Sequence, residues 1–356
     1  MKIAPIMRAL AKHRGVEQLL VHTGQHYDPK MSQVFFDDLE LAPPNVELGI
    51  GSDRHGTQTG RMMIALDRAF TELQPDCVVV VGDVDSTVAA ALAAVKLRIP
   101  CAHVEAGLRS FDRSMPEEIN RIITDGVADL LLTPSADADA NLLAEGIPST
   151  AIHRVGNVMI DTLLMHLESA RARPTLDSFG VTPQAYALAT LHRRSNVDSP
   201  IVLEGLLGAL EWIQERIPVV MPLHPRTRKR LEDLSLIDRA NAMPGLHLSE
   251  PLGYLDFLSL TAAAKFVLTD SGGLQEETTA LGVPCLTMRP TTERPATVSV
   301  GTNIVVGSDP HAIRQRVAEL LAGRGKTGAV PELWDGQASH RAAEVLVDHV
   351  RRVTKG

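Results

Sequence analysis

The sequence of 356 residues is poor in aromatic residues and in cysteine, and it has no long apolar run. Aromatic residues make up 3% of the chain and the formal net charge is −8, which argues against nucleic acid as a partner. No segment approaches the ~20 consecutive apolar residues that span a bilayer, and the start of the chain lacks an apolar signal-peptide core. We therefore expect a cytoplasmic protein that binds neither nucleic acid nor membrane.

The cysteines are odd in number and widely spaced. Cys77, Cys101 and Cys285 each stand in an apolar, strand-like run. This placement predicts buried free thiols in a reducing compartment. Their spacing matches no metal site, so we expect no metal.

Apolar runs of strand length alternate with segments of helical periodicity along the whole chain. The run 77–81 is continuous, as is typical of a strand buried on both faces of a parallel sheet. The expected strands are 19–23, 77–81, 100–105, 130–133, 186–190, 219–223 and 302–306, with two more in the stretch 266–289, and the main expected helices are 2–14, 61–73, 86–97, 202–216 and 251–263. This alternation predicts an α/β fold with doubly wound parallel sheets.

The length of the chain exceeds what one hydrophobic core usually holds, which predicts two domains of similar size. The stretch 168–177 loses apolar periodicity and contains Pro174, so we place the boundary there. We expect a Rossmann-like domain at 1–170, a second Rossmann-like domain at 171–335 and a closing amphipathic helix at 336–356. Two such domains facing across a cleft would gather ligands at the carboxyl ends of their strands.

The stretch 266–289 reads as a strand, a tight glycine turn, a helix, a glycine stop and a second strand. Gly272 and Gly273 let backbone N–H groups approach a ligand at the start of the helix, where the unsatisfied N–H groups and the dipole favour phosphate. Glu276 and Glu277 in the first helical turn could accept hydrogen bonds from ribose hydroxyls. Purely structural βαβ turns share these features, so the motif alone leaves both interpretations open.

Polar residues follow four predicted strands, at 82–83, 103–105, 190–193 and 269–273. With other stretches of the chain they resemble the non-hydrolysing UDP-N-acetylglucosamine 2-epimerase family. The matching stretches are 2–5, 23–26, 81–87, 103–109, 115–121, 155–157, 191–193, 222–225, 268–277 and 291–295, in the family's order. The resemblance implies two Rossmann-like domains of the GT-B kind, a homodimer, a UDP-sugar substrate and no cofactor. It also implies reversible epimerisation of UDP-N-acetylglucosamine to UDP-N-acetylmannosamine for surface polysaccharide.

The chemistry of this reaction limits the residues that can perform it. The C2 proton of a sugar nucleotide lies beside an acetal, so it becomes acidic only when partial departure of UDP gives C1 oxocarbenium character. Loss of both groups yields a 2-acetamidoglucal, and re-addition from the other face gives the epimer. This route needs carboxylates near both sugar faces and cations near the diphosphate. By resemblance, Asp83, Glu105 and Glu117 are the acid and base candidates, and which of them serves which face stays open.

The resemblance assigns further residues to the diphosphate, the substrate and an activator. His192 would stabilise the departing diphosphate, although a lone histidine without family context is more often a core or capping residue. The substrate-binding candidates are Lys2, Arg109, Phe257, Ser271, Gly272, Gly273, Glu277 and Arg294, with Ser271 to Gly273 on phosphate, Glu277 on ribose, Arg294 on the diphosphate and Phe257 on uracil. The candidates for an allosteric site at which substrate itself activates are Gln25, Gln58, Arg61 and His224. Without the resemblance, Phe257 would be interpreted as a core residue. Each of the four activator candidates would be interpreted as a solvated polar loop residue.

The chain departs from the family pattern at two places. Ser195 stands where many members carry a glutamate, which leaves open an epimerase for a related sugar nucleotide such as a 2,3-diacetamido uronic acid. Members also begin with a strand and a glycine-containing turn before the helix at 2–14, so we expect Met1 to be an internal start, with about a dozen residues preceding it in the natural product. The alternatives to a non-hydrolysing 2-epimerase are a GT-B glycosyltransferase, a hydrolysing epimerase, or a truncated UDP-sugar-binding remnant without activity.

Overall fold

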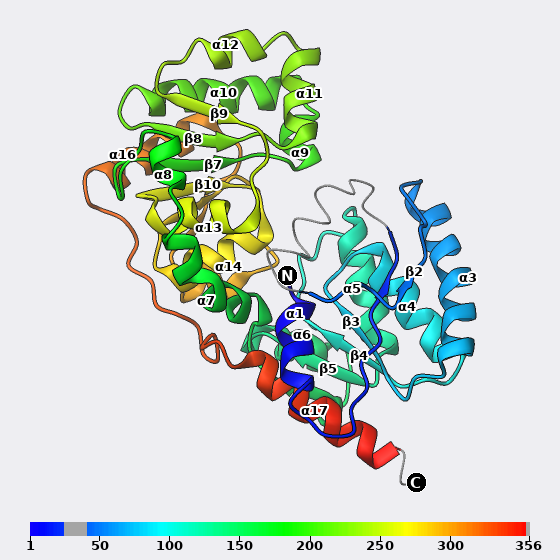
Figure 1. Cartoon of the computed structure of the whole chain (residues 1–356). Coiled ribbons are helices and arrows are strands. Elements are labelled where there is room, and N and C mark those ends of the chain that lie inside the picture. The colour runs from blue at the N-terminus through cyan, green and yellow to red at the C-terminus, as the bar shows by residue number, and fades with distance from the viewer. Residues whose placement is uncertain (25–40, 354–356) are drawn as a thin grey trace. The chain divides into compact units, whose positions relative to one another are not determined.

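The computed structural model describes residues 1–24 and 41–353, and the chain divides into two compact units (Figure 1). Unit 1 comprises Met1–Thr162 and Glu332–Gly356, and unit 2 comprises Leu163–Pro331. We expected divisions at 170/171 and 335/336. The first division falls earlier because helix α7 (Val158–Arg171) begins in unit 1 and continues without a break into unit 2, so no loop marks the change.

Unit 1 contains a four-stranded parallel sheet in the order β3-β4-β5-β6 and a two-stranded parallel sheet, β1-β2. The strands are β1 (Val21–His22), β2 (Val46–Glu47), β3 (Val78–Val81), β4 (Cys101–Val104), β5 (Leu130–Thr133) and β6 (Ile152–Arg154). The register pairs Val78 with Cys101 and Ala102 with Leu130. Strands β4 and β5 are buried along their whole length, although β4 includes His103 within its apolar run.

Helices cover both faces of the unit 1 sheet. They are α1 (Ile3–Leu10), α3 (His55–Leu73), α4 (Asp85–Lys96), α5 (Pro116–Val127), α6 (Ala136–Ala144), the 3₁₀ turn η1 (Ser149–Ala151), the first part of α7, and α17 (Ala338–Val353). On one face Ile6 and Leu346 pack with Ala102 and Leu132, which seats α1 and α17 side by side (Figure 1). On the other face α3 and α4 pack on β3.

Unit 2 contains a six-stranded parallel sheet in the order β12-β11-β10-β7-β8-β9. The strands are β7 (Ala187–Thr190), β8 (Val219–Pro222), β9 (Leu246–Ser249), β10 (Phe266–Thr269), β11 (Cys285–Thr287) and β12 (Asn303–Val305). The helices are α8 (Thr175–Ser178), α9 (Arg194–Val197), α10 (Pro200–Gln214), α11 (Pro225–Asp233), α12 (Ile237–Asn241), α13 (Tyr254–Ala263), α14 (Gly272–Leu281), α15 (Pro295–Ser299) and α16 (Pro310–Leu321).

The alternation of side chains along the unit 2 strands builds two cores. Phe266 and Leu268 of β10 face the layer of α10, α11, α12 and α16, whereas Val267 faces the layer of α8, α13 and α14. The predicted fold class, α/β with doubly wound parallel sheets, is therefore confirmed for both units. The strand order also reverses between β7 and β10, and such a switch point is where open α/β sheets bind ligands.

The expectation of buried free thiols is confirmed for two of the three cysteines and is wrong for the burial of Cys77. All three cysteines are free thiols; Cys101 and Cys285 are buried, whereas Cys77 is half-buried. Burial raises the pKa of Cys101 to about 12 and that of Cys285 to about 11, so neither is a ready nucleophile. Within the described ranges, no helix is both long and apolar enough to span a membrane.

Candidate active site

The switch point of unit 2 is polar. Thr190 ends β7 and Thr269 ends β10; the two residues are in register and their hydroxyls lie 2.7 Å apart. The nearby residues His192 and Asp270 are thereby carried to the same edge of the sheet. Two of the polar clusters found in the sequence, 190–193 and 269–273, therefore lie at this edge.

Asp270 is the buried anion of this edge. Its carboxylate accepts hydrogen bonds from the backbone N–H groups of His192 and Arg193 and from the side-chain amide of Asn196, at 2.9–3.1 Å. Nδ1 of His192 lies 2.8 Å from Oδ1 of Asp270. Burial alone would raise the pKa of Asp270, but the His192 ring and these backbone donors hold it below its ordinary value. Asp270 is therefore ionised at neutral pH.

The glycine turn comes directly after Asp270. Ser271 is the N-cap of α14, and its hydroxyl accepts from the backbone N–H of Leu274. Gly272 is required by packing, because a Cβ there would lie 2.5 Å from Oε1 of Glu293. Gly272 and Gly273 are the first two residues of α14, so their N–H groups belong to the unsatisfied set at its start.

Arginines gather beside this turn around the buried Glu293. Arg289 binds its carboxylate through two nitrogens, at 2.6 and 3.1 Å, and Arg193 and Arg294 lie 3.8 and 4.0 Å away. Burial would raise the pKa of Glu293, but the adjacent Arg294 and Arg289 lower it far below its usual range. Arg294 is itself buried and pairs with Glu276 at 2.8 Å. Three guanidinium groups thus stand around a single Glu293 carboxylate next to Gly272.

Glu277 lies on α14 and is almost completely buried. Burial raises its pKa to about 7; interaction with the Tyr254 hydroxyl opposes the rise and the neighbouring Glu276 adds to it. Tyr254 begins α13, and Phe257 lies one turn later on the same helix. Phe257 is half-buried and packs against the core formed by α13 and α14, so the structure gives this side chain a packing role of its own.

In unit 1 the candidate carboxylates lie around a turn at Gly82. Glu105 directly follows β4, is buried, and forms an ion pair with Lys2. A Cβ at Gly82 would lie 3.1 Å from Nζ of Lys2 and 3.3 Å from Oε2 of Glu105, which brings the three residues together. Glu105 has a φ of 70°, an uncommon conformation for a residue with a side chain and one that clusters at functional sites.

Asp83 comes next to Gly82 and is tied to helix α5. Its carboxylate pairs with Arg121, and its carbonyl accepts from the side-chain amide of Asn120. Glu117 lies in the first turn of the same helix, one turn before Arg121, and is half-buried. The structure therefore brings together Lys2, Asp83 and Glu105, with Glu117 on the helix that holds Asp83.

The loop between Glu105 and Glu117 is shaped by a buried carboxylate. Glu118 accepts from the backbone N–H groups of Ser110 and Phe111, from the Ser110 hydroxyl, and from Arg121. Burial would raise the pKa of Glu118, but the Ser110 N–H and Arg121 lower it. The loop holds Phe111 at φ 59° with 78% of the residue exposed.

Arg109 lies elsewhere, in the core of unit 1. Its guanidinium is 1% exposed and is bound by Asp125 at 2.7 Å, by both oxygens of Glu145 and by the carbonyl of Leu108. Because those partners already engage it from within the fold, we interpret Arg109 as a structural residue and not as a direct substrate contact. Nδ1 of the buried His103 lies 2.6 Å from Oδ1 of Asp125, and Nε2 of His103 lies 2.8 Å from the carbonyl oxygen of Gly82. Through His103, this buried network binds the carbonyl of Gly82 and so helps to fix the turn.

The activator candidates fall into different places. Gln25 lies outside the described residues. Gln58 is buried on α3 and donates to the carbonyl of Gly51 at 2.7 Å, whereas Arg61 is exposed and pairs with Asp53 at 2.8 Å. His224 lies in unit 2, where its ring centroid is 5.7 Å from that of His192.

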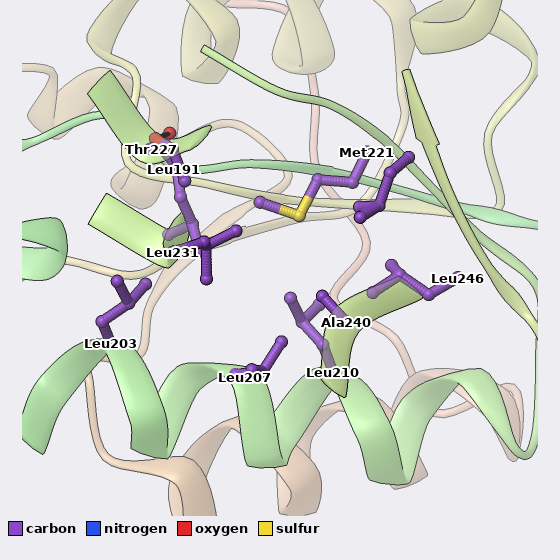
Figure 2. A pocket seen from close by; sticks show the side chains of 10 residues that line it. Leu191, Leu203, Leu207, Leu210, Met221, Thr227, Leu231, Ala240 and Leu246 are labelled. Atoms are coloured by element: carbon purple, nitrogen blue, oxygen red, sulfur yellow. Dashed lines mark hydrogen bonds between the residues drawn. The ribbon is translucent and has the colours of Figure 1, made fainter. Parts of the chain in front are cut away.

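A small void in unit 2 has no part in binding. Figure 2 shows Leu203, Leu207 and Leu210 of α10 projecting toward Met221 of β8. The volume that the centre of a water-sized sphere can occupy is about 10 Å³. The lining is apolar apart from Thr227, whose hydroxyl donates to the Leu191 carbonyl. Such a void is too small for a nucleotide.

The sequence placed Arg193 and Asp270 in polar clusters that follow strands, but it assigned neither of them a role. Arg289 and Glu293 were not singled out, although each lies in or beside a matching stretch. Among the described residues, no group of histidine, cysteine and acidic side chains could hold a metal ion.

Two doubly wound parallel units, one with a glycine turn and clustered arginines at its switch point, define the class of two-domain α/β proteins with a GT-B-like fold. Residues 8–347 match the family model described as UDP-N-acetylglucosamine 2-epimerase. The chain belongs to this family and is an enzyme of it, which confirms the resemblance seen in the sequence.

Relatives refine the comparison. The UDP-N-acetylglucosamine 2-epimerase of Methanocaldococcus jannaschii is 42% identical over 97% of this chain and 95% of its own. The UDP-2,3-diacetamido-2,3-dideoxy-D-glucuronate 2-epimerase of Pseudomonas aeruginosa is 41% identical, with the same coverage. A crystal structure of the M. jannaschii enzyme in complex with UDP-GlcNAc and UDP has a TM-score of 0.91 at 41% identity, over 98% of this chain and 96% of that one.

Proposed function

We propose that the protein catalyses the reversible C2 epimerisation of UDP-N-acetylglucosamine to UDP-N-acetylmannosamine. The C1–O bond to UDP breaks and the C2 proton passes to a carboxylate, which leaves a C1–C2 double bond in 2-acetamidoglucal. A proton then returns to C2 on the other face while a diphosphate oxygen of UDP attacks C1. Atoms balance over the cycle, so no cofactor is needed.

The observation that carries this proposal is the cluster at the Gly82 turn. Asp83 and Glu105 are both ionisable and each is paired with a cation, Arg121 and Lys2 respectively. A carboxylate placed beside C2 can accept its proton or return one to it. Glu117, on the helix that supplies Arg121, adds the further carboxylate that chemistry on two sugar faces requires.

Unit 2 has groups that suit a nucleoside diphosphate. The N–H groups that open α14, together with Arg193, Arg289 and Arg294, suit the two phosphates of UDP. We propose that Glu277 accepts hydrogen bonds from the ribose hydroxyls. Replacing Glu277 with alanine should therefore weaken UDP binding while changing kcat much less, because the ribose contact is similar in the ground and transition states. Calorimetry with UDP measures this, and unchanged affinity would refute the assignment.

A second substrate remains a candidate because of the P. aeruginosa relative, whose identity of 41% nearly equals the 42% of the M. jannaschii enzyme. The test is a proton NMR time course with UDP-N-acetylglucosamine and, in parallel, with the UDP-2,3-diacetamido uronic acid. A new anomeric signal of the 2-epimer in the first sample supports the proposal. Turnover confined to the second sample would assign the related substrate, and binding without turnover in both would indicate a non-catalytic protein.

We further propose a homodimer that works in the cytoplasm, as the family resemblance implies. Light scattering should then give a mass twice the 38.5 kDa of one chain. A mass of one chain at micromolar concentration would refute the dimer.

A further inference from the structure

Two histidines lie side by side at the switch point of unit 2. His192 comes after β7, and His224 comes after β8 as the N-cap of α11; their ring centroids are 5.7 Å apart with a tilt of 38°. Two imidazolium ions this close would repel each other, so the pair favours a state in which only one ring is charged. The hydrogen bonds of each ring show which one that is.

His224 is arranged as a neutral acceptor. Its Nδ1 accepts the backbone N–H of Arg226 at 3.1 Å, which caps α11 and requires a lone pair on that nitrogen. The proton of the ring must then be on Nε2. The surroundings agree, because burial, the neighbouring His192 and Arg226 lower the pKa of His224, with only Asp270 acting in the opposite direction.

His192 is arranged as a donor. Its Nδ1 lies 2.8 Å from the carboxylate of Asp270, which is fully buried and anionic. An ionised carboxylate only accepts, so Nδ1 of His192 carries a proton. A third of the His192 side chain is exposed, and its Nε2 is available for a second proton.

We propose that Asp270 and the start of α11 fix opposite roles for the two rings: Asp270 orients His192 to carry positive charge at Nε2, and His224 is held neutral. Asp270 is thus a positioning residue. The inference rests on the proposed function and adds to it that the charged His192 stabilises the diphosphate as it leaves C1, the role that the sequence resemblance implies for this residue. It parallels other enzymes in which a buried aspartate fixes the tautomer and charge of a working histidine.

The charged groups around the pair are Asp270, Arg226 and Arg193. Asp270 faces both rings, Arg226 lies beside His224, and the guanidinium of Arg193 is directed to Glu293. Asp270 is therefore the anion that decides the charge of His192.

The first experiment is nitrogen-15 NMR of the protein labelled at histidine, with and without UDP. The chain has 13 histidines, so variants His192→Gln and His224→Asn identify the two signals. We expect His224 as the Nε2–H tautomer across neutral pH, and His192 protonated at Nδ1 at every pH and at both nitrogens on the acid side of its titration. A proton on Nδ1 of His224, or its absence from Nδ1 of His192, would overturn the inference.

The second experiment replaces Asp270 with asparagine, with Asp198→Asn as the matched control because Asp198 is an exposed carboxylate of the same unit that pairs with Arg226. Asp270→Asn should lower kcat by on the order of 10²-fold and move the alkaline limb of the kcat profile to lower pH. Asp198→Asn should leave both within about twofold. An unmoved limb in Asp270→Asn would contradict the role, and if that variant does not fold, the wild-type NMR decides.

The two hypotheses fail differently. If the tautomers are as assigned but no UDP-sugar is epimerised, the proposed function is wrong and the protonation pattern stands. If the protein epimerises its substrate with the other tautomers, only the role of Asp270 is wrong.

Discussion

The buried Glu277 gives a prediction that can be worked through quantitatively. Its carboxyl group is almost fully buried on α14, and burial raises its pKa from 4.5 to about 7. Each unit of pKa difference between folded and unfolded states is worth about 1.4 kcal/mol at 25 °C. The ionised form therefore costs unit 2 about 3 kcal/mol of folding free energy.

Whether the free energy of unfolding rises or falls with pH depends on how many protons the folded and unfolded states bind. Below pH 4.5 the carboxyl group is protonated in both states, so stability is unaffected. Between pH 4.5 and about 7 the folded state binds more protons than the unfolded state, so the free energy of unfolding falls as pH rises. Above about pH 7 the full cost is present and constant.

The assay is urea unfolding of the wild type and Glu277→Gln at pH 5, 6, 7 and 8, followed by tryptophan fluorescence. Trp212 reports unit 2 and Trp334 reports unit 1. The glutamine variant should gain stability relative to the wild type as pH rises, by about 2.5 kcal/mol between pH 5 and 8. Glu232→Gln, an exposed carboxylate of unit 2, should show no such gain. A constant difference between Glu277→Gln and the wild type would refute the reasoning.

Other predictions concern the unit 1 turn. Asp83→Asn, Glu105→Gln and Glu117→Gln should each lower kcat strongly, by on the order of 10²-fold, while calorimetry still detects UDP binding; wild-type kcat in all three would remove them from the mechanism. Phe111→Gly should leave unit 1 about 1 kcal/mol more stable than Phe111→Ala in urea unfolding, because only glycine adopts a φ of 59° without cost, and equal stability would show that the loop is not strained. Gly82→Ala should lower both stability and kcat, since its Cβ would press on Lys2 and Glu105 at a φ of 75°, and a fully active, stable variant would contradict the described turn.

The central strands were predictable because a local feature of the sequence is enough to identify them. A strand buried on both faces needs an unbroken apolar run, and the expected strand 130–133 matches β5 residue for residue. The edge strands β6 and β9 were not among the expected strands. One side of an edge strand meets solvent, so β6 and β9 are only partly buried and their apolar patterns are interrupted.

The site was predictable only as far as side chains lie at strand ends. Asp83, Glu105 and His192 could be located this way, because parallel strands carry the residues at their carboxyl ends to one edge of the sheet. The burial of Arg109 could not be seen, since its neutralising partners, Asp125 and Glu145, are distant in sequence. The same holds for the pairing of His192 with Asp270 and with His224, which depends on the β10-β7-β8 order.

The most direct test of the proposed mechanism is the fate of the hydrogen at C2. The protein is incubated with UDP-N-acetylglucosamine in D₂O, and both epimers are recovered and examined by NMR and mass spectrometry. Elimination and re-addition through 2-acetamidoglucal predict one solvent deuterium at C2 of the N-acetylmannosamine product, together with trace release of UDP and the glucal. Formation of the epimer with its original hydrogen retained at C2 throughout turnover would contradict the mechanism.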